Sequence, residues 1–232
     1  MKAFRSARRK TAVWWRFRYY LLSAVLAVAL WDTPVVKPFR VFVVMVHEVC
    51  HAATAMATGG EVVEIRAFSN ESGHTLTRGG WVPGVTAAGY VGCALLGALL
   101  IWSGIVPQLQ RLSVLLIGGA TMAMTMAFTP TGKADFYLGI FGGLVFVVMS
   151  LYSTRMGCAA AIWLGVMLCL YSLEDFRTDL WLFPEYTDAG ILAQFWGWGL
   201  WAAYLIAGTW VMMSTVVMYG ALRSLIRHRS RR

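Results

Sequence analysis

Apolar segments long enough to enter a membrane recur along this chain from end to end. They lie at about 19–31, 39–58, 83–106, 112–128, 136–152, 157–173 and 189–219. A helix crosses the hydrocarbon core of a bilayer with about 20 residues, and only 13% of this chain is charged, about half the usual share in soluble domains. The sequence therefore predicts an all-α polytopic membrane protein: a bundle of about six to seven transmembrane helices, forming a single membrane-embedded domain over residues 1–232.

The net charge of +9 is concentrated at the two ends of the chain. Seven basic residues fall within residues 1–18 and five within residues 223–232. Both tails adjoin apolar segments, so topology signals and contacts with anionic lipid explain them better than nucleic-acid binding. The positive-inside rule predicts that both termini are cytoplasmic, in a cell membrane (plasma or inner).

Two termini on one side of a membrane require an even number of spans. One of the seven apolar segments is therefore expected to be re-entrant or merged with a neighbour, within residues 112–152. With the N-terminus inside, the first segment would run outward through Leu21–Leu30, and the helix beginning near Phe39 would return inward.

His47, Glu48 and His51 form the sequence His-Glu-Val-Cys-His inside the apolar segment 39–58. On a helix, residues i and i+4 share a face, so both imidazoles can bind one metal ion with Glu48 beside them. This spacing is typical of zinc metallopeptidases, in which the glutamate takes a proton from the metal-activated water. His47 lies roughly 12 Å into the helix, near the middle of the bilayer, where ionisable side chains usually mark a functional site.

A catalytic zinc site needs about three protein ligands and an open position for water. Two further histidines, His74 in a predicted turn and His228 in the basic tail, are weaker candidates. Carboxylates gather between the last two apolar segments, at Glu174, Asp175, Asp179, Glu185 and Asp188. Asp175 ends one segment and Asp188 opens the next, where it could instead cap the helix. Either aspartate can be the third ligand, and spacing alone does not choose between them.

Residues 59–82 are the one clear non-helical stretch within the apolar part of the chain. The sequence 62–68 has β-branched residues, 69–73 has turn chemistry, and 74–78 can return antiparallel. This pattern predicts a small β-hairpin directly after the metal-binding helix. The hairpin could be a plain cytoplasmic connector, or its edge strand could pair with an extended substrate. In the next segment, Gly89 and Gly92 are small residues that permit close helix packing.

Several of these motifs resemble the site-2 protease class of intramembrane zinc metallopeptidases. The resemblance begins with His47-Glu48-x-x-His51-Ala52, Gly59-Gly60 and a strand containing Ile65. Further matches resemble a compact branch of that class without a PDZ domain: Gly73-x-Thr75, Arg78-Gly79-Gly80, Ala88-Gly89-Tyr90-x-Gly92, Leu170-Tyr171-x-x-x-Asp175 and Thr187-Asp188-Ala189. The similarity covers about residues 39–201.

The resemblance implies zinc (Zn²⁺) bound by two histidines and an aspartate, and substrates that are transmembrane segments of other proteins. In better-known members the aspartate belongs to an asparagine–proline…aspartate–glycine motif. Residues 184–190 here read Pro-Glu-Tyr-Thr-Asp-Ala-Gly, without the asparagine. By position Asp188 is the better match and Asp175 the alternative.

Two other hypotheses for the function remain open at this point. The first is a non-catalytic membrane scaffold or binding protein with the same fold. The second is a metal transporter, which would need further polar residues along a path through several spans. Outside residues 174–188 the apolar segments offer few such residues, so the peptidase is the favoured hypothesis.

Overall fold

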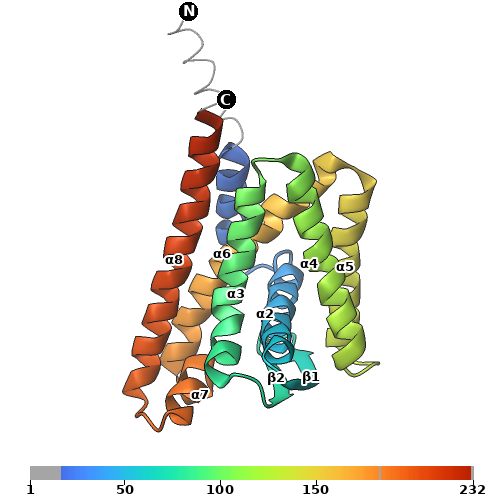
Figure 1. Cartoon of the computed structure of the whole chain (residues 1–232). Coiled ribbons are helices and arrows are strands. Elements are labelled where there is room, and N and C mark those ends of the chain that lie inside the picture. Colours follow the sequence, from blue (N-terminus) through green and yellow to red (C-terminus); the bar gives the residue numbers. More distant parts are fainter. Residues whose placement is uncertain (1–16, 183, 231–232) are drawn as a thin grey trace, which may run out of the picture.

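Six helices in the described part of the chain are long and apolar enough to cross a membrane. The computed structural model describes residues 17–182 and 184–230, with the backbone alone at 174–182 and 228–230. The candidate spans, drawn in Figure 1, are α2 (Lys37–Ala57), α3 (Val82–Ser103), α4 (Pro107–Phe128), α5 (Ala134–Tyr152), the Thr154–Leu173 part of α6 (Thr154–Leu182) and the Trp201–Arg227 part of α8 (Trp201–Ser230). The fold class predicted from the sequence is confirmed.

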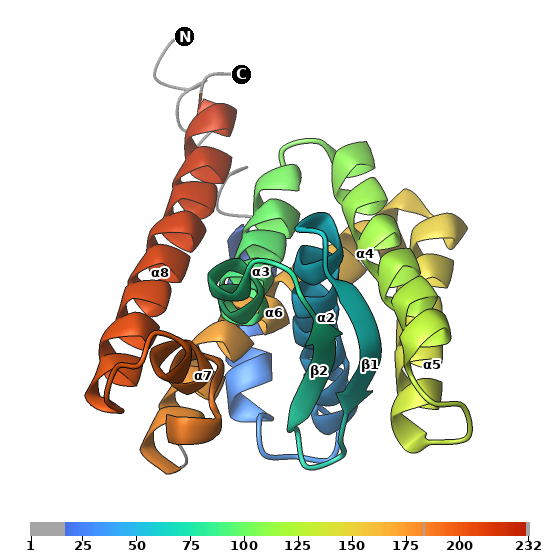
Figure 2. The same ribbon diagram turned by 60° about the horizontal axis from the view of Figure 1, so that its bottom comes forward.

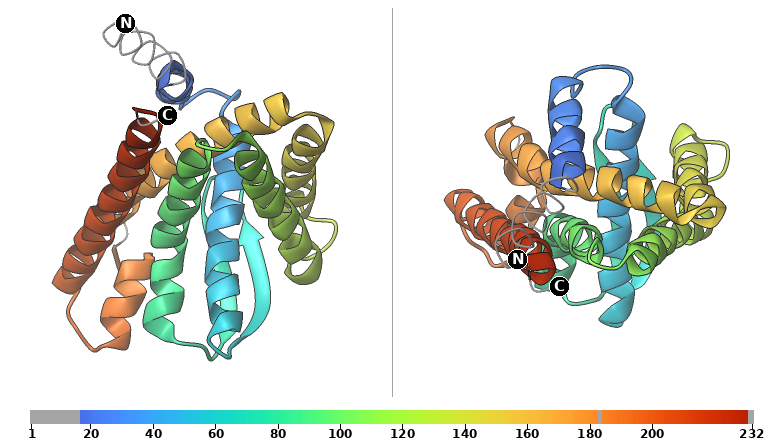
Figure 3. Two further views of the ribbon diagram at one scale, coloured as in Figure 1. Left: turned by 45° about the horizontal axis from the view of Figure 1, so that its top comes forward. Right: turned by 90° about the horizontal axis from the view of Figure 1, so that it is seen from above.

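The first apolar segment forms a helix over Phe17–Ala29, which is too short to count among these spans. Figure 3 shows this helix at the same end of the bundle as the start of α2 and the C-terminal end of α8. The prediction that a segment within residues 112–152 would be re-entrant or merged with a neighbour is therefore wrong, because α4 and α5 both have the length of a span. The segment that does not count as a span is the first one. Of the predicted basic tails, residues 1–16 and 231–232 lie outside the described residues.

The helix α2 is the centre of the bundle. In its candidate span 67% of the residues are buried inside the protein, compared with 28% in α5 and in α8. Its buried face includes the apolar run Val41–Val46 as well as His47, Glu48 and His51. Neighbouring helices therefore shield these ionisable side chains from lipid, so that the cost of placing them at membrane depth is reduced.

The chain after α2 folds into the predicted β-hairpin. The strands β1 (Glu61–Ala67) and β2 (Gly73–Arg78) pair antiparallel, with an irregularity in register between Val62 and Glu64. Gly59 follows the end of α2 with a φ of 83°, a left-handed conformation that glycine adopts without strain and that reverses the chain. Figure 2 shows the consequence: the hairpin folds back along α2 instead of extending away from it.

Two ion pairs attach the hairpin to the helices around it. At its tip, Glu71 pairs with Arg40 near the start of α2. On β1, Nε of Arg66 donates to Oδ2 of Asp135 in α5 over 2.5 Å. The hydrogen bond to Asp135 raises the pKa of the Arg66 guanidinium, which therefore stays charged. The hairpin is thus attached to the bundle at two separate points.

A short connection joins α6 to α8 at the end of the bundle opposite the C-terminal end of α8 (Figure 1). It contains the single 3₁₀ turn η1 (Pro184–Tyr186) and the two-turn helix α7 (Asp188–Phe195). The buried residues of α7 pack with Tyr90 of α3 and with the apolar face of α8. This packing brings the N-terminus of α7 toward the middle of α2.

Candidate metal centre

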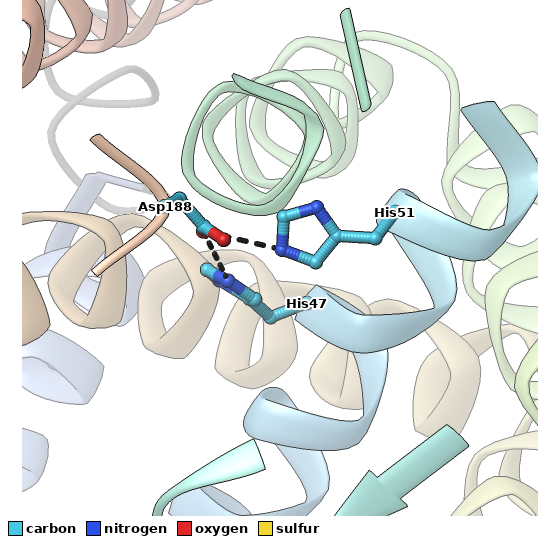
Figure 4. Close-up of side chains that lie close together, drawn as sticks. All are labelled: His47, His51 and Asp188. Atoms are coloured by element: carbon cyan, nitrogen blue, oxygen red, sulfur yellow. Dashed lines mark hydrogen bonds and ion pairs between the residues drawn. The ribbon is translucent and has the colours of Figure 1, made fainter. Parts of the chain in front are cut away.

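His47, His51 and Asp188 converge on one point between α2 and α7, as Figure 4 shows. The Nε2 atoms of His47 and His51 each lie 3.2 Å from Oδ2 of Asp188. The three donor atoms all lie within 4.8 Å of one another. The structure thus brings together both histidines of the motif and the aspartate that best matches the resemblance.

The donor set fits a zinc ion in the type of its ligands and in the two separations that involve Asp188. Donor atoms about 2.0–2.1 Å from a tetrahedral zinc lie about 3.3 Å from one another, close to the 3.2 Å that separates Asp188 from each imidazole. Two imidazoles and one carboxylate are the ligands of several catalytic zinc sites, in which the fourth position stays open. Asp175, the alternative third ligand, belongs to α6 by its backbone, and its side chain lies outside the described part of the chain.

The two imidazoles are oriented in different ways. Nδ1–H of His51 donates to the carbonyl oxygen of Val85 over 2.5 Å, so that Nε2 is the atom that would offer its lone pair to a metal once its own proton is displaced. His47 is held by aromatic packing: its ring contacts the rings of Tyr90 and Tyr171 edge-on, with centroids 4.9 and 6.0 Å away. Its Nδ1 is buried and has no hydrogen-bond partner among the residues that the structure describes.

Asp188 is the first residue of α7, but it does not cap that helix. Thr187 is the N-cap, and its Oγ1 accepts from the backbone N–H of Gly190 over 3.0 Å. The capping role considered for Asp188 is therefore wrong, and its carboxylate is free to face the histidines. Burial alone would raise the pKa of Asp188, but the adjacent His51 and the hydrogen bonds with both imidazoles hold it well below its usual range. The carboxylate is therefore ionised, as a metal ligand must be.

The backbone of α3 closes the site at Gly89. A Cβ atom at this position would lie 2.2 Å from Nε2 of His47 and 2.5 Å from Nε2 of His51. One turn later, a Cβ on Gly92 would meet the side chain of Cys50 at 2.9 Å. The predicted close packing of small residues therefore occurs here, and it places the α3 backbone against the Nε2 atoms of both histidines.

Gly89→Ala is accordingly expected to displace the two imidazoles and to weaken metal binding by more than about tenfold, since even outer-shell changes have effects of 10–100-fold. Zinc content after equilibration with a zinc buffer measures this. Gly119→Ala in α4 is the matched control, because a Cβ there meets nothing within 4 Å. Equal zinc affinity in the two variants would contradict the placement of the site against Gly89.

Glu48 is buried beside the histidines, and the hairpin covers it. Oγ1 of Thr75 lies 2.8 Å from Oε2 of Glu48 and 2.9 Å from its backbone oxygen. A Cβ on Gly73 would lie 2.4 Å from Oε1 of Glu48. Sequence reasoning missed this contact; Gly73-x-Thr75 was singled out only as part of the resemblance, because no local pattern pairs residues 27 positions apart.

The other two histidines are not part of this cluster in the described structure. The ring of His74 lies tilted against that of Phe68 on the hairpin, with centroids 5.7 Å apart. His228 lies near the end of α8, and its side chain is outside the described residues. The position of His74 agrees with its weaker candidacy, and the weaker candidacy of His228 stays a prediction.

The chain is similar to one known protein family. The family model described as Peptidase M50B-like matches residues 20–221, which include the motif, the hairpin and α7. No curated protein and no solved structure matches the chain. The family match confirms the resemblance to site-2 proteases, which are membrane metallopeptidases. This multi-pass membrane protein belongs to the Peptidase M50B-like family.

Proposed function

We propose that this protein is an intramembrane zinc metalloendopeptidase that hydrolyses peptide bonds in or near the transmembrane segments of other membrane proteins. The observation that carries the proposal is the convergence of two imidazoles and a carboxylate beside Glu48, all on or against the most buried helix. His47 is the eleventh of the 21 residues of α2, roughly 15 Å along its axis. The site therefore lies about halfway along a candidate span.

Each of the four residues has a role that its position supports. His47, His51 and Asp188 would hold the zinc ion. When bound, zinc supplies a Lewis acid that polarises the scissile carbonyl and lowers the pKa of water. Glu48 accepts a proton from the attacking water and delivers it to the leaving amine. Burial of the cluster by α3, α7 and the hairpin keeps lipid away from these charged groups.

A transmembrane substrate has to unwind before it can be cleaved, because each peptide bond of a helix is hydrogen-bonded within the helix. The hairpin is suited to hold the unwound segment. Within the described part of the chain it is a two-stranded sheet in which β2 pairs only with β1, and Figure 2 shows β2 on the side nearer α7. The free edge of β2 would add the substrate as a third strand beside the metal. Glycine and proline in a client helix would make unwinding easier.

The charges support a cytoplasmic location for both termini in the cell membrane. Residues 1–40 contain nine basic residues and one acidic residue, and residues 223–232 contain five basic residues and none that are acidic. The described helix Phe17–Ala29 and the end of α8 share one end of the bundle (Figure 3). The positive-inside rule assigns that end to the cytoplasm. In this arrangement α2 runs outward, opposite to the direction predicted when Phe17–Ala29 was counted as a span.

The test of this function is a comparison of membrane protein fragments in cells that express the wild type and cells that express Glu48→Gln. We expect fragments cut within or next to transmembrane segments in the wild type alone. Identical fragments in both would support the non-catalytic scaffold instead. A metal transporter would leave the fragments identical and change the cellular metal content.

A further inference from the structure

We propose that Thr75 is a positioning residue that fixes the carboxylate of Glu48, and that the ion pair at the hairpin tip keeps Thr75 in place. The inference rests on the proposed function, because the orientation of Glu48 affects turnover only if Glu48 carries a proton. In addition to the four residues of the proposed active site, activity would then depend on an ion pair at the far end of the hairpin.

The local contact is specific. Glu48 is buried, with 5% of its surface exposed, and a buried carboxylate is normally hydrogen-bonded. Among the described residues, Oγ1 of Thr75 is the side-chain donor to this carboxylate, at 2.8 Å from Oε2. Thr75 is within reach of both oxygens, and hydrogen bonds to an ionised acceptor are stronger than neutral ones, so it donates to Oε2 when Glu48 is ionised, as a general base must be. The flexible glutamate side chain is thereby restricted.

The hairpin also limits where the second carboxylate oxygen can lie. Gly73 approaches Oε1 of Glu48 so closely that even one carbon atom added there would overlap it. Gly73 and Thr75 are both on β2, two residues apart, so they face the same side of the strand. One strand face therefore determines the position of both oxygens of Glu48.

The tip of the hairpin is attached to the same helix that carries Glu48. Arg40 lies eight residues before Glu48 on α2, and it pairs with Glu71, four residues before Thr75. Glu71 has a φ of 70°, a conformation that side chains other than glycine rarely adopt and that needs outside support. The pair with Arg40 supplies that support. These two polar contacts add to the packing of both strands along α2, and release of the tip would loosen β2 and Thr75 relative to Glu48.

A double-mutant cycle tests the coupling. Thr75→Val, which removes the hydroxyl and keeps the shape, is expected to lower kcat about tenfold to hundredfold with KM and zinc content unchanged, since small misplacements of a catalytic group cost up to about 10²-fold. Thr75→Ser is expected to restore kcat to within about threefold of the wild type. Glu71→Gln alone is expected to lower kcat severalfold, and to have no further effect in the Thr75→Val background.

The matched control for Glu71→Gln is Glu61→Gln, which makes the same change at the exposed start of β1. This control is expected to keep the wild-type kcat. The proposal is overturned if Thr75→Val keeps wild-type kcat, if Thr75→Ser loses as much as Thr75→Val, or if the effects of Thr75→Val and Glu71→Gln on kcat simply multiply. Should Thr75→Val fail to fold, Glu71→Gln must still lower kcat at constant KM, and an unchanged kcat overturns the proposal. A wild type without turnover would instead refute the proposed function.

Discussion

Purified Glu48→Gln is expected to retain about one zinc ion per chain and to lose peptidase activity. Glutamine has the same shape as glutamate, and its amide oxygen can still accept the hydrogen bond from Thr75, so the hairpin contact survives. It cannot take a proton from water. General acid–base catalysis contributes about 10²–10⁴-fold, and Glu48 is proposed to act both as base and as acid. We therefore expect turnover to fall by at least about 10³-fold, measured on a client segment found by the fragment comparison.

The control for this variant is Glu185→Gln, the same chemical change in η1, on the short connection that also carries Asp188. It is expected to keep both zinc and turnover. Retained turnover in Glu48→Gln would reject the proton-transfer role of Glu48. An equal loss in Glu185→Gln would show that the assay responds to a general disturbance of this region, and that outcome would also contradict the prediction.

The parts of the site that depend on local periodicity could be predicted from the sequence. His47 and His51 share a helix face because they are four residues apart, and the apolar residues around them predict the buried helix that the structure contains. The hairpin was predictable for the same reason, since turn residues lie between two short β-prone runs. The motif needed no knowledge of the rest of the chain.

Long-range contacts could not be predicted in this way. Asp188 is 137 positions beyond His51, and no spacing rule relates them; the sequence therefore left Asp175 and Asp188 both open. A local signal was available for the question of capping: Thr187 precedes Asp188, and threonine is itself a favoured N-cap residue, so the aspartate was not needed in that role. The contact between Thr75 and Glu48 depends on how the hairpin folds back, which is a property of the packed structure.

The number of membrane spans shows a different limit of prediction from the sequence. The composition of the first apolar segment resembles that of a membrane span, but its described helix, Phe17–Ala29, is shorter than the roughly 20 residues that a span needs. Hydropathy identifies residues that avoid water, and it does not by itself distinguish a crossing helix from one that lies at the end of the bundle. The even span count expected from the two basic tails was the more reliable guide.

Asp188→Ala is expected to lose zinc, with an affinity more than about 100-fold weaker than that of the wild type, because loss of a ligand has a larger effect than the 10–100-fold loss typical of its supporting residues. The two remaining imidazoles are on one helix and leave two open coordination positions, which is fewer protein ligands than catalytic zinc sites use. Activity should disappear together with the metal, in contrast to Glu48→Gln. Zinc titration of the purified protein in detergent measures the affinity.

Asp175→Ala is the decisive comparison for Asp188→Ala, since the same truncation is then made at the other aspartate that the sequence offers as third ligand. If Asp188 binds the metal, Asp175→Ala keeps wild-type zinc affinity. Loss of zinc in Asp175→Ala with retention in Asp188→Ala would transfer the role to Asp175. Retention in both would mean that the two histidines bind zinc without an aspartate from this region, and the proposed centre would then be wrong. The outcome therefore decides whether α7 completes the metal site or only packs beside it.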